Sequence, residues 1–98
     1  LADETRLRIV FMLSQRELTV TDICAALDLN QSAVSKHLIK LRLLGVVHDV
    51  REGSFIYYSL NDENKDYMKL IRFLMTEFSQ IETFQEDLAN LNRISPGQ

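Results

Sequence analysis

The apolar positions at the start of the chain recur at intervals of three and four residues, the spacing of an amphipathic helix. The segment 3–14 places Leu7, Val10, Phe11 and Ser14 on one face. Asp3 and Glu4 stand at its beginning, where the helix dipole favours negative charge. We therefore predict a first helix over 3–14, followed by a turn at "QRE".

A second helix is predicted directly after Thr19. Its apolar residues follow the helical interval again: Val20, Ile23, Cys24 and Leu27. Thr19 is followed three residues later by Asp22, the pattern of a helix N-cap with an acidic residue in the first turn. The helix is expected to end near "DLN".

Asn30 is expected to cap a third helix with the sequence "QSAVSKHLIKLRLLG". Its buried stripe is predicted to be Val34, Leu38 and Leu41. Gly45 stands where a left-handed residue commonly ends a helix. Two short helices joined by a tight turn, the second with a polar outer face, predict a helix-turn-helix over about 19–45.

The pattern changes in "VVHDVREGSFIYYSL" to an alternation of about two residues. Two runs rich in Val, Ile, Tyr and Phe are separated by Glu52-Gly53, which predicts a hairpin, or wing, over about 46–60 with its turn at that dipeptide. Because an isolated two-stranded hairpin is only marginally stable, the wing should pack against the preceding helices.

From Asn61 onward the helical interval returns over a longer stretch. The apolar stripe consists of Tyr67, Leu70, Leu74, Phe78, Ile81, Phe84, Leu88 and Leu91. Such a stripe of about 25 residues, roughly 37 Å long, exceeds what a small helix-turn-helix core covers. We predict a long C-terminal dimerisation helix over about 62–91, whose interface with a second copy of the chain contains Tyr67, Leu70, Leu74, Phe78 and Ile81.

Length and composition favour one domain over residues 1–98, mainly α with a β-hairpin wing. Its 98 residues, 46% hydrophobic, are too few to bury most of their surface alone. The lone Cys24 excludes an internal disulfide, no apolar run approaches the roughly 18–20 residues of a membrane span, and no secretory leader opens the chain. We expect a cytoplasmic protein, with a few residues preceding Leu1 because the chain starts inside a helical pattern.

The formal net charge of −3 hides a basic middle segment. Residues 61–98 contain seven acids and four bases, which accounts for the whole −3, whereas residues 31–51 contain four bases and one acid, for a sum of +3. Phosphate binding depends on local charge rather than on the total. The acidic balance therefore does not exclude nucleic acid as a partner.

The outer face of the third helix has the residue types that a helix in the major groove needs. These are short polar side chains that allow close approach, an amide that can read base edges, and cations for phosphates. The predicted DNA contacts are Gln31, Ser32, Ser35, Lys36, His37 and Lys40, joined by Arg51 at the wing tip. The alternatives are a merely solvated helix face and, for Arg51, a plain surface turn.

The sequence offers no enzyme or metal constellation. It contains no glycine-rich phosphate loop and no H-E-x-x-H motif, and Cys24 has no evident base beside it. His37 and His48 have no acidic or thiol partner at ligand spacing, so a structural or DNA-contacting role for His37 and a strand position for His48 are favoured over a metal pair. We therefore expect neither catalysis nor a cofactor.

Four stretches together resemble the ArsR/SmtB family of small bacterial winged-helix repressors. They are "LADETRLRIVFML", "ELTVTDIC", "NQSAVSKHLIKLRLLGVV" and "REGSFIYYSL", and the resemblance covers nearly all of residues 1–91. It implies a homodimer that places two recognition helices in successive major grooves of an operator overlapping a promoter. It also implies release from DNA when an inducer, usually a metal ion or metalloid, binds.

One departure from the resemblance concerns the inducer. Arsenic-responsive members carry a C-x-C-x-x-C run of thiolates before the recognition helix, and here the run reads T-x-T-x-x-C with Thr19, Thr21 and Cys24. Hydroxyls are poor ligands for soft ions, which select thiolates. A second family site, built from His, Asp and Glu on the C-terminal helices, also lacks support because residues 61–98 contain no histidine.

Three explanations of the threonines stay open. The protein senses something else through Cys24 or a pocket at the dimer interface, it has lost sensing, or the threonines were introduced into the chain. Two other functions also stay open: a winged-helix module that binds only proteins, and a repressor that senses thiol-reactive species through Cys24. The inducer, the operator and the regulated genes are not predicted.

Overall fold

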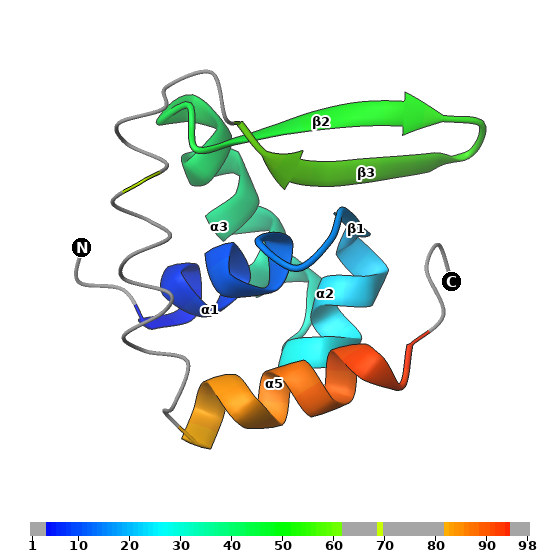
Figure 1. Cartoon of the computed structure of the whole chain (residues 1–98). Coiled ribbons are helices and arrows are strands. Elements are labelled where there is room, and N and C mark those ends of the chain that lie inside the picture. The colour runs from blue at the N-terminus through cyan, green and yellow to red at the C-terminus, as the bar shows by residue number, and fades with distance from the viewer. Residues whose placement is uncertain (1–3, 62–68, 70–81, 95–98) are drawn as a thin grey trace.

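A computed structural model describes residues 4–61, 69 and 82–94 of the chain (Figure 1). Its elements in chain order are α1 (Glu4–Leu13), β1 (Leu18–Thr19), α2 (Val20–Leu27), α3 (Gln31–Leu43), β2 (Val47–Glu52), β3 (Phe55–Leu60) and α5 (Glu82–Asn92). The predicted fold class, mainly α with a β-hairpin wing, is confirmed. The periodicity did not predict β1, because two residues are too few to show an alternation.

The helix α1 is buried over more of its surface than the predicted stripe. Val10 and Phe11 are buried as expected and Leu7 packs partly against the core, but Ser14 is exposed just beyond the helix end. Three further side chains of the same helix are buried: Ile9, Met12 and Leu13. The reason is that α1 is central and contacts α2, α3, α5 and β3, so its C-terminal half has no solvent face.

Both predicted N-caps are confirmed. The Thr19 hydroxyl accepts a hydrogen bond from the Asp22 N–H at 3.1 Å, and the Asp22 carboxylate accepts one from the Thr19 N–H at 3.2 Å. This reciprocal pair is a capping box at the start of α2. The Asn30 side chain accepts from the Ala33 N–H at 2.8 Å at the start of α3. Both helices of the motif therefore begin at a side-chain cap that the sequence indicates.

The end of α3 also follows the prediction for Gly45, which has a φ of +79°. The Val46 N–H donates to the Leu41 carbonyl at 2.9 Å and the Gly45 N–H donates to the Arg42 carbonyl at 3.0 Å. These two bonds form a Schellman motif, which turns the chain from α3 into β2.

The sheet has the strand order β1-β3-β2, and both pairs are antiparallel. Glu52 pairs with Phe55, so the hairpin turn consists of Gly53 and Ser54. The prediction of Glu52-Gly53 was wrong by one residue, because a positive φ, here +65° at Gly53, belongs to the first central residue of a type II′ turn. Leu18 and Thr19 pair with Tyr58 and Tyr57, which joins the start of α2 to the wing.

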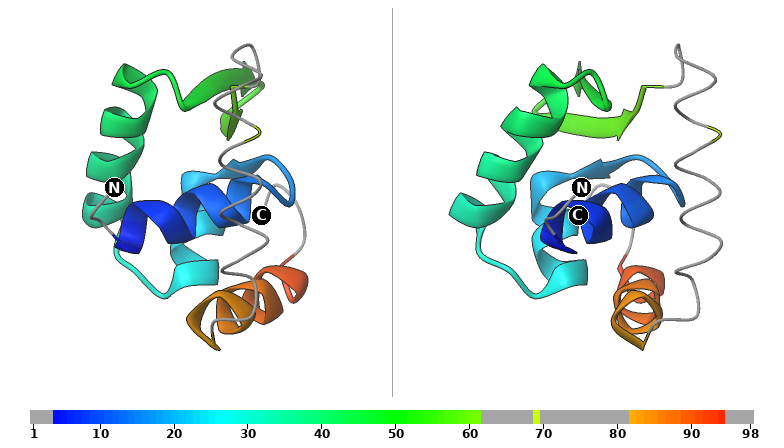
Figure 2. Two further views of the ribbon diagram at one scale, coloured as in Figure 1. Left: turned by 60° about the vertical axis from the view of Figure 1, so that its left-hand side comes forward. Right: turned by 90° about the vertical axis from the view of Figure 1, so that its left-hand side faces the viewer.

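The helix α5 packs against α1 and α2, at the end of the molecule opposite the wing (Figure 2). Leu88 and Leu91 belong to the predicted apolar stripe but not to its predicted interface with a second chain, and the structure shows that their own chain covers them. Leu91 is 1% exposed within the core of its own chain, and Leu88 packs against the same core. The interface residues expected at 67, 70, 74, 78 and 81 lie outside the described residues.

Polar contacts join α5 to the rest of the fold. The Arg8 guanidinium donates to both oxygens of Asp87 at 2.9 Å and to the Leu27 carbonyl at 3.0 Å. The hydrogen bond with Asp87 raises the pKa of Arg8 above its ordinary value. The Asn90 side-chain amide donates to the Ala26 carbonyl at 2.9 Å. The last two carbonyls of α2 thus accept hydrogen bonds from side chains of α1 and α5.

Candidate nucleic-acid interface

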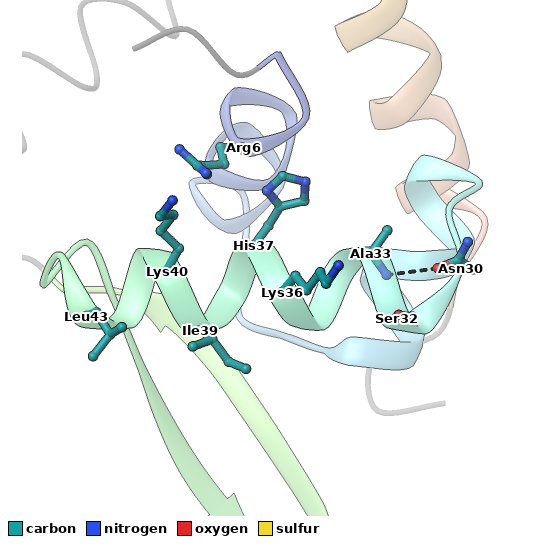
Figure 3. A pocket seen from close by; sticks show the side chains of 9 residues that line it. All are labelled: Arg6, Asn30, Ser32, Ala33, Lys36, His37, Ile39, Lys40 and Leu43. Atoms are coloured by element: carbon teal, nitrogen blue, oxygen red, sulfur yellow. Dashed lines mark hydrogen bonds between the residues drawn. The ribbon is translucent and has the colours of Figure 1, made fainter.

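The outer side of α3 borders an open groove of about 610 Å³, lined mainly by that helix and closed on one side by α1 (Figure 3). The lining residues are Arg6, Asn30, Ser32, Ala33, Lys36, His37, Ile39, Lys40 and Leu43. The opposite side of α3 is the buried stripe that the sequence predicted: Val34, Leu38 and Leu41. One face of the helix is therefore held in the core and the other is free to meet a partner.

The structure divides the predicted contact residues between the groove and its surroundings. Ser32, Lys36 and Lys40 are at the groove and His37 rises from α3 towards α1, beside Arg6 (Figure 3). Two others do not line the groove, Gln31 and Ser35. At 100° per residue they lie on the flank of α3 that also carries Arg42, next to the wing.

The positive charge of this surface is concentrated on few side chains. Arg42 forms an ion pair with Asp49 of β2 at 3.3 Å, and both side chains are exposed enough for water to weaken the attraction. Asp49 is the only acid within residues 31–51, and it is the partner of Arg42. The remaining cations of the segment are Lys36, Lys40 and Arg51, and all three are exposed.

The wing places Arg51 on a definite side of the sheet. Val47, Asp49 and Arg51 stand at every second position of β2, so their side chains point to the same face of the sheet. Val47 is buried against the core and Asp49 reaches Arg42 of α3, so this face looks towards α3. Arg51 is exposed near the tip, where its Nε donates to the Gly53 carbonyl at 3.3 Å. Its charge extends the basic surface of α3 along the wing.

The sequence analysis missed two kinds of groove residue. Arg6 comes from α1, and no local pattern shows that the first helix closes the groove. Ile39 and Leu43 also line the groove, and the sequence analysis assigned neither of them to the site. Ile39 and Leu43 are 53% and 81% exposed. The signal that could have found them is their seven- and eleven-residue separation from Ser32, which places all three on one face.

The residues of the T-x-T-x-x-C run do not form a cluster of ligands. The Thr19 hydroxyl is occupied by the N-cap bond, Thr21 is exposed, and Cys24 packs partly against the core. Burial raises the pKa of the Cys24 thiol, which disfavours the thiolate. Within residues 4–61, 69 and 82–94, no group of three His, Cys, Asp or Glu side chains is placed to hold a metal ion.

The described residues form a helix-turn-helix followed by a two-stranded wing, with a basic, open face on the second helix of the motif; this is the winged helix-turn-helix class. The chain belongs to the ArsR family of bacterial regulatory proteins, whose family model matches residues 3–49. No helix among the described residues is long and apolar enough to cross a membrane.

Similar proteins agree with this assignment. Over 62 residues the chain is 48% identical to the arsenical resistance operon repressor of Escherichia coli K12, covering 62% of this chain and 53% of the repressor. Over 81 residues it is 37% identical to the transcriptional activator HlyU of Vibrio cholerae, covering 82% of this chain and 75% of HlyU. The chain spans about half the length of the two curated arsenic-resistance regulators that head its matches.

A solved structure with a similar fold is described as a homodimeric winged helix-turn-helix DNA-binding domain from Mycobacterium bovis, a possible ArsR-family regulator. It superimposes with a TM-score of 0.68 at 29% identity, covering 83% of this chain and 74% of that domain.

Proposed function

We propose that this chain is a cytoplasmic, homodimeric transcriptional repressor that binds double-stranded operator DNA with α3 in the major groove. The observation that carries the proposal is the open face of α3, where Lys36 and Lys40 are exposed beside Ser32 and opposite the buried stripe. Lysines there can neutralise phosphates, and a serine near the helix start lets the backbone approach base edges. Gln31 and Ser35 contact the DNA from the flank next to the wing, and His37 from the α1 side.

The wing supplies the second contact. Arg51 stands near its tip on the face that looks towards α3, so it extends along the phosphates or into the minor groove beside the site of α3. The Arg42–Asp49 ion pair supports this geometry by joining α3 to β2, although an exposed pair of this kind contributes little stability.

The direction of regulation is part of the proposal. Among its relatives one is named a repressor and another an activator. Repression follows if the operator overlaps a promoter, because bound protein then excludes polymerase. A reporter placed behind such an operator should be silenced by the chain; higher reporter output on expression would assign activation instead.

Dimerisation is proposed through the apolar stripe that contains Tyr67, Leu70, Leu74, Phe78 and Ile81. It is supported by the homodimeric state given for the Mycobacterium bovis domain. A two-fold dimer would present two copies of α3 to half-sites about one helical turn apart. The wild-type chain should sediment as a dimer at micromolar concentration and Leu74→Glu should dissociate it, whereas a monomeric wild type would contradict the proposal.

The DNA contact is tested by fluorescence anisotropy with a labelled duplex between about 50 and 200 mM salt. The wild-type affinity should fall steeply, and Lys36→Ala should lower the slope of log K against log salt by about 0.9 for each phosphate that the variant no longer neutralises. Ser35→Ala should change sequence preference instead. Lys69→Ala is the matched control, since Lys69 is exposed but lies outside α3 and the wing. Equal binding by wild type, Lys36→Ala and Ser35→Ala would refute the assignment.

We also propose that Thr19, Thr21 and Cys24 do not form a soft-metal site. Cys24 offers one thiol, and the Thr19 hydroxyl is occupied at the N-cap of α2. Trivalent arsenic should therefore leave the protein–DNA complex intact. Thr19→Cys/Thr21→Cys would supply three thiols but must unwind the start of α2 to bring them together, so this variant should bind arsenic and lose DNA affinity. Release of the wild type by arsenic would contradict this part of the proposal.

A further inference from the structure

The exposed face of α3 contains an aliphatic side chain where a DNA-reading helix usually has polar ones. Ile39 is 53% exposed and lines the groove together with Ser32, Lys36 and Lys40. Figure 3 shows Ile39 pointing away from α1 and out of the fold. Nothing in the packing of the described residues requires a branched aliphatic residue there, because the buried stripe of α3 is on the other side.

The position of Ile39 along the helix matches that of a base-contacting residue. In homeodomains the base-contacting positions of the recognition helix are spaced i, i+3, i+4 and i+7. The same spacing from Ser32 gives Ser35, Lys36 and Ile39. At 1.5 Å per residue Ile39 lies about 10 Å along the axis from Ser32, whereas Leu43 lies about 17 Å away, towards the end of the helix.

We propose that Ile39 reads the 5-methyl group of thymine in the major groove, so that α3 selects half-sites with a thymine opposite this position. This inference rests on the proposed function. The thymine methyl group is the apolar feature of the major-groove edge, and aliphatic side chains recognise it by contact. Ser32 and Lys36 nearby provide a hydrogen-bonding contact and a phosphate contact. Ile39 adds an apolar contact to the DNA contacts of α3.

The charge around Ile39 favours DNA over a protein as its partner. Lys36 and Lys40 border the same groove, and no described acid lines it. An aliphatic side chain beside exposed cations fits the edge of the major groove, where the thymine methyl group lies near phosphates. An apolar protein surface would gain nothing from those cations.

The test begins with selection of tight-binding duplexes from a random library with the wild-type chain. Each thymine of the selected half-site is then replaced by uracil, which removes only the methyl group. At one position the wild type should bind the uracil duplex about fourfold more weakly, the effect of losing one buried methyl group. Ile39→Ala should bind both duplexes equally, and it should fold because alanine is the better helix former. Leu44→Ala is the matched control, since Leu44 is exposed at the end of α3 but does not line the groove.

Five results would overturn the inference. The selected half-sites could lack a thymine, or the wild type could bind thymine and uracil duplexes equally at every position. Ile39→Ala could keep the discrimination, which would assign it to another residue. Absence of any salt-dependent duplex binding would refute the proposed function itself. Binding of a protein to the face of α3 that carries Ile39 would then replace both the proposed function and this inference. Equal loss of discrimination in Leu44→Ala would show a general effect of trimming α3.

Discussion

Two regions of the molecule use charged side chains in opposite ways. At the end formed by α1, α2 and α5, Arg8 is paired with Asp87, and their side chains are only 17% and 3% exposed. On the outer side of α3, Lys36 and Lys40 are exposed beside an open groove. A paired, partly buried cation fixes the relative positions of helices, whereas an exposed cation without a nearby acid is available to a ligand. The first region is scaffold, and the second is the candidate site.

The largest expected effect is the loss of stability when the acid of each ion pair is removed. Asp87→Ala leaves the partly buried Arg8 guanidinium without its carboxylate partner and should lower the free energy of unfolding by about 1.5–3 kcal/mol, the range for hydrogen bonds to charged groups. Asp49→Ala breaks the exposed pair with Arg42 and should cost less than about 1 kcal/mol. Urea unfolding of both variants, at one protein concentration because a dimer is expected, measures the difference. Similar losses for the two variants would remove the distinction between scaffold and site.

The two N-caps allow a second comparison between the scaffold and the candidate site, with smaller expected losses of stability. Thr19→Val keeps the side-chain volume but removes the hydroxyl from a buried capping box, and should cost about 1–2 kcal/mol. Asn30→Ala removes an exposed cap and should cost about 0.5–1 kcal/mol. Because Asn30 borders the groove, its variant should also weaken DNA binding, whereas Thr19→Val should not. Thermal unfolding measures the loss of stability, and duplex anisotropy measures the loss of DNA affinity. Weaker DNA binding by Thr19→Val with unchanged binding by Asn30→Ala would contradict the distinction between scaffold and site.

The smallest expected effect concerns the thiol on the scaffold side. Burial raises the pKa of Cys24, so a smaller fraction is thiolate at neutral pH than in a free cysteine. Its reaction with a thiol reagent at pH 7 should be slower than that of free cysteine, and the rate should rise with pH through a midpoint above the ordinary thiol value. Reaction at pH 7 as fast as that of free cysteine would instead favour a sensor function for Cys24.

The local elements were predictable because their signals are local. Thr19 with Asp22, Asn30 and Gly45 define helix ends through bonds within a few residues, so the pattern alone indicates them. The alternation of the wing was equally clear, and only the turn was displaced by one residue, since Glu52 pairs across the hairpin.

The errors arose where tertiary packing decides. An amphipathic stripe shows that one side of a helix is covered but does not show what covers it, so the pattern did not indicate that Leu88 and Leu91 pack on their own chain. The contribution of Arg6 to the groove depends on how α1 crosses α3, which no spacing shows. Gln31 and Ser35 were grouped with Lys36 and Lys40 because all are polar, whereas the structure separates them by direction around the helix.

Amide chemical shifts of the isotope-labelled chain, recorded while a tight-binding duplex is added, test the central claim most directly. The account predicts the largest changes along residues 31–43 and near Arg51 at the wing tip. It predicts little change in α5 (Glu82–Asn92), which lies at the end of the molecule opposite the wing. Changes concentrated in α5 or around Arg8, with α3 unaffected, would contradict the assignment of the outer face of α3 as the DNA-binding site.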